Sequence, residues 1–142
     1  MKNNLPCTVF SLSAEETYQI GKSFGSRMKG GELIILTGEL GMGKTVLAKG
    51  IASGMGIDPD DVNSPSFLIV NEHRGRIKLF HIDLYRIKSE EEIEEIGIRD
   101  ILEIGGVVVV EWGEKLPSFY RKGAITISIS DMGEDTRKII IN

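Results

Sequence analysis

The sequence predicts one α/β domain spanning residues 1–142, with helices covering both faces of a central sheet in three layers. A glycine-rich loop lies between a short apolar run and a helix-like run, as in a strand–loop–helix unit. Four consecutive valines at 107–110 predict a strand covered on both faces. Residues 124–130 alternate apolar and polar side chains, and residues 137–141 follow a turn at 131–135, which predicts a closing antiparallel hairpin. A chain of 142 residues is long enough for three layers but not for two separate cores.

Composition limits the classes of function. Hydrophobic residues make up 41% and charged residues 27% of the chain, with a formal net charge of −4. The negative charge argues against tight unaided binding of nucleic acid, because neutralisation of phosphates supplies most of that affinity. The one cysteine, Cys7, excludes an intramolecular disulfide and fits a reducing cytosol. The sequence has no apolar run of membrane-spanning length and no signal-peptide pattern, so we expect a cytoplasmic protein without a membrane partner.

The first elements expected are a short strand at residues 8–10 and the helix that follows it. Ser13 and Glu16 have the spacing of a capping box, in which the hydroxyl caps the helix and the carboxylate reaches back. Glycines at 30 and 31 end this helix before the next strand, residues 33–36.

That strand leads into a sequence with the G-x-x-x-x-G-K-T spacing of a phosphate-binding P-loop, or Walker A motif. Glycines let several backbone N–H groups point at one anion, and the following helix adds the positive end of its dipole. Lys44 is expected to reach the β- and γ-phosphates as a catalytic residue, and the Thr45 hydroxyl to hold Mg²⁺. The predicted nucleotide-binding residues are Gly38, Glu39, Leu40, Gly41, Met42, Gly43, Lys44, Thr45 and Val46.

The segment after the P-loop helix, residues 57–66, is rich in turn-forming residues. It is either an ordinary loop or a switch loop in which Ser64 and Pro65 reorder with the nucleotide state. Two β-like runs, residues 67–71 and 76–82, then flank a glycine and predict a hairpin.

The second strand of that hairpin ends at Asp83, where a P-loop protein places a carboxylate that meets Mg²⁺ or the attacking water. Arg86 follows and is either an ion-pair partner or a group that contacts the γ-phosphate or a partner surface. A second capping box at Ser89 opens an acidic helix that Gly97 interrupts. Its glutamates are a solvated face or a docking surface for a basic partner.

The valine strand delivers Glu111 at its end, and four apolar residues directly before this glutamate make it the best Walker-B-like acid in the chain. Asp83 and Glu111 therefore compete for, or share, the metal-binding and water-orienting roles. Trp112 beside them packs in the core or at its rim, or contacts a base or a partner.

Together these motifs resemble the TsaE (YjeE) family, small bacterial P-loop ATPases required for threonylcarbamoyladenosine modification of tRNA. Besides the P-loop, the resemblance is carried by residues 63–67 (Asn-Ser-Pro-Ser-Phe), 81–86 (His-Ile-Asp-Leu-Tyr-Arg), 94–100 (Glu-Glu-Ile-Gly-Ile-Arg-Asp) and 110–112 (Val-Glu-Trp). These segments occur in the family's order and cover most of the chain. Met42 and Val46 differ from many members, at positions of the motif that tolerate variation.

The resemblance implies a P-loop NTPase fold with a mixed sheet, ATP at the P-loop, Mg²⁺ held through Thr45 and Glu111, and Asp83 needed for hydrolysis. It also implies TsaD and TsaB as partners, with tRNA reached only indirectly, since TsaD is the subunit that transfers the threonylcarbamoyl group. ATP turnover would then reset the TsaD–TsaB complex between catalytic cycles. We expect weak intrinsic ATPase activity that depends on the partners, because a domain this small has no evident second module to close over the nucleotide.

The residues leave three rival functions. A small-molecule kinase usually carries a lid with several arginines, whereas the arginines of this chain are scattered among the ends of the predicted elements. A regulatory GTPase would carry an N-K-x-D sequence after the loop, and this chain has none. A nucleotide-gated binding module with incidental hydrolysis is the non-enzymatic alternative.

Overall fold

The computed structural model describes residues 6–38, 43–62 and 69–142. The middle of the predicted P-loop, Glu39, Leu40, Gly41 and Met42, lies outside the described residues, as do the predicted switch residues Ser64 and Pro65.

Strands and helices alternate along most of the chain. The strands are β1 (Cys7–Ser11), β2 (Leu33–Thr37), β3 (Val70–Arg74), β4 (Lys78–Asp83), β5 (Val107–Glu111), β6 (Ile125–Gly133) and β7 (Thr136–Ile141). The helices are α1 (Ala14–Gly25), α2 (Lys44–Gly54), α3 (Glu90–Glu95), α4 (Ile98–Glu103) and α5 (Ser118–Arg121), with short 3₁₀ helices η2 (Pro59–Asp61) and η3 (Gly113–Lys115).

The strands form one mixed sheet of seven strands in the order β1-β7-β6-β2-β5-β4-β3. Its centre is parallel: β2 pairs with β5 and β6, and β5 pairs with β4. Both margins are antiparallel, through β6–β7–β1 on one side and the β3–β4 hairpin on the other. The predicted mixed sheet is therefore confirmed, and the carboxyl ends of β2, β4 and β5 meet at one edge.

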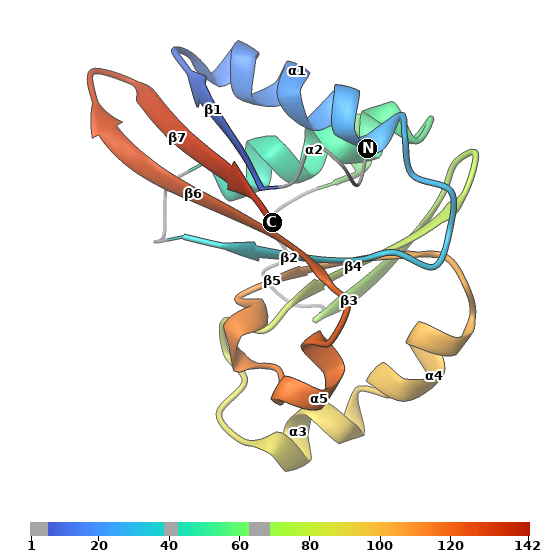
Figure 1. The fold of residues 1–142 in the computed structure, drawn as a ribbon. Helices are drawn as coiled ribbons and strands as arrows, with labels where there is room; N and C mark the ends of the chain where they lie inside the picture. The colour runs from blue at the N-terminus through green and yellow to red at the C-terminus, as the bar shows by residue number, and fades with distance from the viewer. Residues whose placement is uncertain (1–5, 39–42, 63–68) are drawn as a thin grey trace.

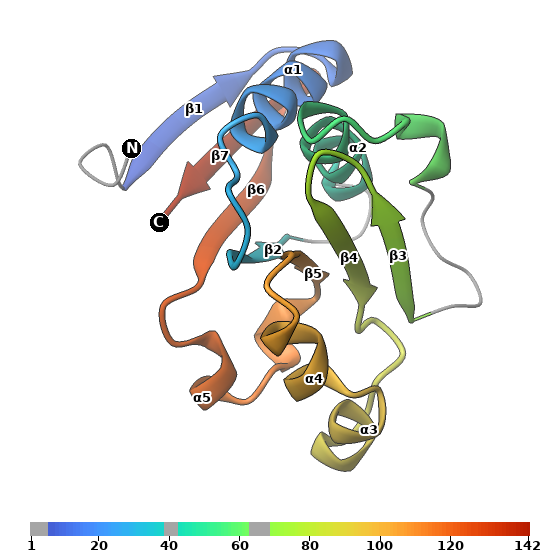
Figure 2. The same ribbon diagram turned by 90° about the vertical axis from the view of Figure 1, so that its right-hand side faces the viewer.

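Helices cover both faces of the sheet, as predicted (Figures 1 and 2). α1 and α2 pack on one face over a core that includes Val107 and Val109, while α3, α4 and α5 pack on the other over Val108 and Val110. The alternation within β5 explains why its valines run consecutively, because each face of this strand is buried.

Both predicted capping boxes are confirmed. The Ser13 hydroxyl accepts a hydrogen bond from the Glu16 N–H at 3.1 Å, and the Glu16 carboxylate reaches back to the Leu12 N–H. The Ser89 hydroxyl likewise accepts from the Glu92 N–H at 3.3 Å. Gly97 separates α3 from α4, so the predicted break is at the right residue.

The C-terminal hairpin is confirmed, but its predicted turn at 131–135 is too long. β6 continues to Gly133, with a register shift between Asp131 and Gly133, and only Glu134 and Asp135 form the turn. Both turn residues have positive φ, 51° and 65°, as a two-residue hairpin connection whose twist matches the strands requires.

Across the described segments, no helix combines the length and the apolar character needed to cross a membrane.

Candidate active site

The described ends of the P-loop lie at the edge of the sheet where β2, β4 and β5 end. Gly38 directly follows β2, and a Cβ added to it would lie 2.6 Å from the carbonyl oxygen of Ile129, so a larger residue would collide with β6. Gly43 precedes α2 with φ of 92°, a conformation that residues with a side chain rarely adopt. The chain thus leaves β2 and enters α2 through two positions that need glycine.

Lys44 opens α2 and is almost buried, with 5% of its surface exposed. Its ammonium group donates a hydrogen bond to the Gly38 carbonyl oxygen at 2.6 Å and lies 3.8 Å from the centre of the Trp112 ring. Burial lowers the pKa of Lys44, and the nearby Glu111, Glu114 and Asp83 carboxylates oppose that shift. The neighbouring carboxylates therefore favour the charged form of Lys44, while its burial away from water disfavours that form.

The two predicted acids face each other across neighbouring strands. Asp83, the last residue of β4, pairs in register with Glu111, the last residue of β5, and Leu36 of β2 lies in the same row. Burial raises the pKa of Asp83; the Glu111 carboxylate raises it further, while a hydrogen bond from the Tyr85 N–H lowers it. Asp83 keeps that hydrogen bond through Oδ1 at 3.0 Å.

Glu111 is also buried, with 4% of its surface exposed. Its Oε2 lies 2.6 Å from Nε2 of His81, which is itself 1% exposed. A buried carboxylate requires such a partner, because an unpaired charge removed from water is very costly.

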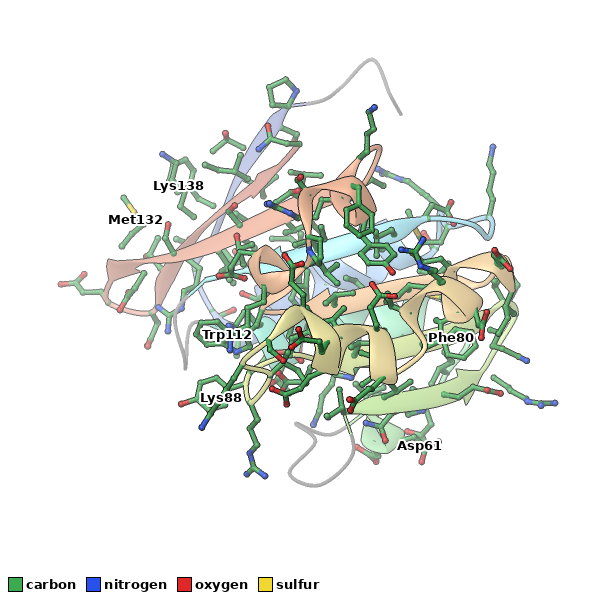
Figure 3. All side chains as sticks on the ribbon, turned by 90° about the horizontal axis from the view of Figure 1, so that it is seen from below. Asp61, Phe80, Lys88, Trp112, Met132 and Lys138 are labelled. Carbon is green, nitrogen blue, oxygen red and sulfur yellow. The ribbon has the colours of Figure 1, made fainter. Side chains whose placement is uncertain are left out.

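Two aromatic rings pack against each other just beyond the carboxyl ends of β4 and β5. The rings of Trp112 and Tyr85 lie 5.2 Å apart and are tilted, and Lys115 lies 5.9 Å from each ring. The Lys115 ammonium group also donates to the backbone carbonyls of Tyr85 and Ile87. Figure 3, seen from below, labels Trp112 and Phe80 on opposite sides of the view. The ring that covers Lys44 is therefore held by the segments that follow β4 and β5.

The other predicted site residues have different surroundings. Thr45 and Val46 lie half-buried in the first turn of α2. Arg86 is exposed and forms no ion pair with any residue that the structure describes, so the ion-pair interpretation of Arg86 is not borne out there. Sequence reasoning did not assign His81 to the site. Its spacing of two from Asp83 was a signal, since residues i and i+2 of a strand share a face.

The donor set suits a magnesium ion. The Thr45 hydroxyl and the Asp83 and Glu111 carboxylates are hard oxygen ligands of the kind that Mg²⁺ takes. In the described ranges, no three His, Cys, Asp or Glu side chains are grouped closely enough to hold a metal ion by themselves. Mg²⁺ usually uses one or two carboxylates together with substrate phosphates and water, so the residues present fit that arrangement.

Comparisons with known proteins find related sequences. The family model described as "Threonylcarbamoyl adenosine biosynthesis protein TsaE" matches residues 11–139. A protein of Treponema pallidum named tRNA threonylcarbamoyladenosine biosynthesis protein TsaE is 35% identical over 131 residues, covering 92% of this chain and 96% of the relative. A Bacillus subtilis protein of the same name is 37% identical over 130 residues, covering 91% and 80%.

A solved structure is similar as well. The crystal structure of YdiB from Bacillus subtilis superposes with a TM-score of 0.74 at 30% identity, covering 95% of this chain and 83% of that one.

Proposed function

This chain belongs to the TsaE family of threonylcarbamoyladenosine biosynthesis proteins, and on that premise we propose that it binds and hydrolyses ATP to reset a TsaD–TsaB complex. The family supports a role in making threonylcarbamoyladenosine in tRNA. The single observation that carries the ATPase proposal is the row of Asp83 and Glu111 beside Lys44, at the edge of the sheet where the P-loop begins and ends.

Phosphate binding follows from the start of α2. The N-terminus of this helix presents backbone N–H groups and the positive end of its dipole, and Lys44 adds a cation. A triphosphate would compete with the Gly38 carbonyl and the Trp112 ring for the Lys44 ammonium. Because anionic oxygens bind an ammonium more strongly than a neutral carbonyl or a ring does, the lysine would move to the β- and γ-phosphates.

Hydrolysis requires a water molecule in line with the γ-phosphorus. The water oxygen forms a bond to phosphorus, the bond to the β,γ-bridging oxygen breaks, and one water proton is lost as ADP and phosphate form. Asp83 is the residue that we assign to orient this water, since one of its oxygens is fixed by the Tyr85 N–H and the carboxylate is only half-buried. Lys44 stabilises the charge that develops on the phosphates.

The Thr45 hydroxyl and the Glu111 carboxylate are the groups that would hold Mg²⁺, which when bound offsets the negative charge of the β- and γ-phosphates. Glu111 suits this role better than Asp83 because it is more deeply buried and its orientation is fixed by His81. The two acids therefore divide the metal-binding and water-orienting roles between them.

The experiment is a steady-state ATPase assay of the wild type, Asp83→Asn and Glu111→Gln, with and without TsaD–TsaB and tRNA. The wild type should hydrolyse ATP slowly alone and change its rate markedly with the complex. Asp83→Asn should keep ATP affinity and lose about 10²-fold or more in kcat, because the variant keeps the size of the side chain but loses the charge that orients the water. Glu111→Gln should need a higher Mg²⁺ concentration than the wild type to reach half of its maximal ATPase rate.

Asp135→Asn, at an exposed acid in the turn between β6 and β7, is the matched control and should behave as the wild type. Rapid hydrolysis by the chain alone, unaffected by TsaD–TsaB, would contradict the proposal. A phosphorylated product formed with any small acceptor would favour a kinase instead.

A further inference from the structure

The contact between His81 and Glu111 is a short hydrogen bond between two buried side chains. Nε2 of His81 lies 2.6 Å from Oε2 of Glu111, and the two residues are 1% and 4% exposed. Hydrogen bonds to an ionised acceptor are shorter and about twice as strong as neutral ones. The contact therefore fixes the Glu111 carboxylate more firmly than a solvated ion pair would.

The direction of this hydrogen bond follows from the chemistry of its partners. A carboxylate that binds Mg²⁺ is ionised and only accepts, so in the metal-binding state Nε2 of His81 must carry the proton and donate it. The other ring nitrogen, Nδ1, is buried and has no hydrogen-bond partner in the part of the chain that the structure describes. Glu111 is thus the polar group that the His81 ring contacts among the described residues. A side chain that only filled the space would not need a nitrogen atom at the position of Nε2.

Strand register explains why this histidine reaches Glu111. Asp83 lies opposite Glu111, and His81 lies two residues earlier on β4, on the same face of the sheet. A long side chain can reach the diagonal neighbour on an adjacent strand. The histidine ring contacts Oε2, and no described residue forms a hydrogen bond with Oε1. One carboxylate oxygen is thereby held, and the other is left for a ligand.

From these contacts we propose that His81 is a positioning residue that holds the Glu111 carboxylate in the orientation in which it binds Mg²⁺. The inference rests on the proposed function, in which Glu111 is a magnesium ligand. Groups that hydrogen-bond to metal ligands set both the orientation and the basicity of those ligands. Without the His81 donor, Glu111 would be a buried carboxylate free to turn away from the metal.

The test compares His81→Met with His81→Gln. Glutamine and methionine have nearly the same length and volume, but only the glutamine amide can donate a hydrogen bond from the position of Nε2. The readout is the affinity for a non-hydrolysable ATP analogue, measured by calorimetry over a series of Mg²⁺ concentrations. In His81→Met the Mg²⁺ concentration giving half of the full effect should rise about 10- to 100-fold, while in His81→Gln it should stay within about threefold of the wild type. Affinity without Mg²⁺ should be the same in all three proteins.

Two results would overturn the inference. In one, both variants keep the wild-type Mg²⁺ requirement while His81→Met melts at a lower temperature, which is the behaviour of a purely structural histidine. In the other, the folded glutamine variant is as impaired as the methionine variant, so that the donor is not what matters. If the wild type itself shows no Mg²⁺-dependent binding of the analogue, the proposed function fails, and the inference fails with it.

A second measurement needs no substitution. The chain has two histidines, so the ring nitrogens of His81 and His73 can be assigned by long-range ¹H–¹⁵N correlation NMR. His81 should carry its proton on Nε2, both free and with the Mg²⁺–nucleotide analogue bound. A ring protonated only on Nδ1 could not donate to Glu111 and would contradict the inference even if His81→Met did not fold.

Discussion

At the scale of single residues, Lys44 makes two contacts that nucleotide binding must break. Its ammonium group is bound to the Gly38 carbonyl and lies against the Trp112 ring, and Trp112 is the only tryptophan of the chain. The energy of these contacts is subtracted from the energy gained at the phosphates. Trp112 is consequently placed to report the movement of the lysine through its own emission.

Lys44→Met tests this arrangement, because methionine keeps the length and apolar packing of the stem and removes the charge. ATP affinity should fall more than tenfold, since a charge-assisted contact to phosphate contributes about 1.5 to 3 kcal/mol. ATP should also change Trp112 emission in the wild type and not in the variant. Lys49→Met, a half-buried lysine further along α2, is the control and should keep both properties. A variant that bound ATP as tightly as the wild type would contradict the role of Lys44.

His73 predicts a dependence of stability on pH. Burial lowers its pKa, and the neighbouring His81 lowers it further, so the folded state binds the proton less tightly than the unfolded state, whose histidine titrates near 6.5. Above that pH both states are neutral and the full stability is present. As the pH falls below about 6.5 the unfolded state takes up the proton first, and stability is lost.

Urea unfolding at pH 7.5 and 5.5 measures this effect. The wild type should lose more free energy of unfolding between these values than His73→Phe, which keeps an aromatic ring and cannot titrate. Arg74→Ala, an exposed neighbour on β3, should keep the wild-type dependence. Equal losses in the wild type and His73→Phe would show that His73 does not titrate as inferred.

The role of a single residue could be predicted when the sequence pattern that indicates it lies within one short segment. The flanks of the P-loop are defined by spacing within one segment, and Asp83 and Glu111 each directly follow an apolar run. That the two acids are neighbours depends on β4 pairing with β5, which the sequence suggested through the rule for strand ends. The spacing of His81 from Asp83 indicates that they share a face of β4, but the bond from His81 to Glu111 also depends on the register of β4 against β5, which no local pattern encodes.

At the scale of elements, the close packing of α1 on α2 depends on glycines from both helices. A Cβ on Gly21 or Gly25 would lie 2.5 or 2.1 Å from backbone oxygens of α2, and a Cβ on Gly50 or Gly54 would lie 2.2 Å from backbone oxygens of α1. Each helix therefore carries two glycines spaced by four residues that allow the backbones to approach. Since α2 begins at Lys44, this contact also holds the amino end of the helix against the sheet edge.

Gly50→Ala tests that packing. The added methyl group would meet the Tyr18 carbonyl oxygen at 2.2 Å, so the helices must separate. We expect a loss of about 2 kcal/mol in the free energy of urea unfolding, because overpacking costs about 1 to 3 kcal/mol and exceeds the gain in helix propensity. Lys22→Ala on the exposed side of α1 should change it by less than about 0.5 kcal/mol. A Gly50→Ala protein as stable as Lys22→Ala would contradict the close contact.

Element boundaries were predictable where a side chain caps a helix and less so where strands pair. Ser13 and Ser89 marked helix starts correctly because a capping box is a local hydrogen-bond pattern. The end of β6 was misplaced because Asp131 and Gly133 are turn-forming residues that here belong to an irregular strand. The pairing of β1 could not be predicted, because its partner strand, β7, lies more than a hundred residues away in the sequence.

At the scale of the whole molecule, the proposed site should couple nucleotide binding to global stability. A ligand that binds only the folded state stabilises it by about 2.7 kcal/mol at 100 times its Kd, which for a chain of 142 residues corresponds to a rise of roughly 8 to 10 °C in Tm. Calorimetric melts with Mg²⁺ and ATP should show this rise. Melts with AMP, which lacks the β- and γ-phosphates, should not show it, and at the same ATP concentration Lys44→Met should show a clearly smaller rise, because its affinity is lower. A similar rise in that variant would place the nucleotide elsewhere.

The pairing of β1 with β7 has a consequence for the making of this protein. β7 lies between β1 and β6, and in the described part of the chain β1 has no other neighbour in the sheet. A ribosome releases a polypeptide from its amino end, so β1 leaves the ribosome long before the segment that will hydrogen-bond to it has been synthesised. The nascent chain therefore carries an unsatisfied strand throughout translation, and the sheet closes only after synthesis has reached β7.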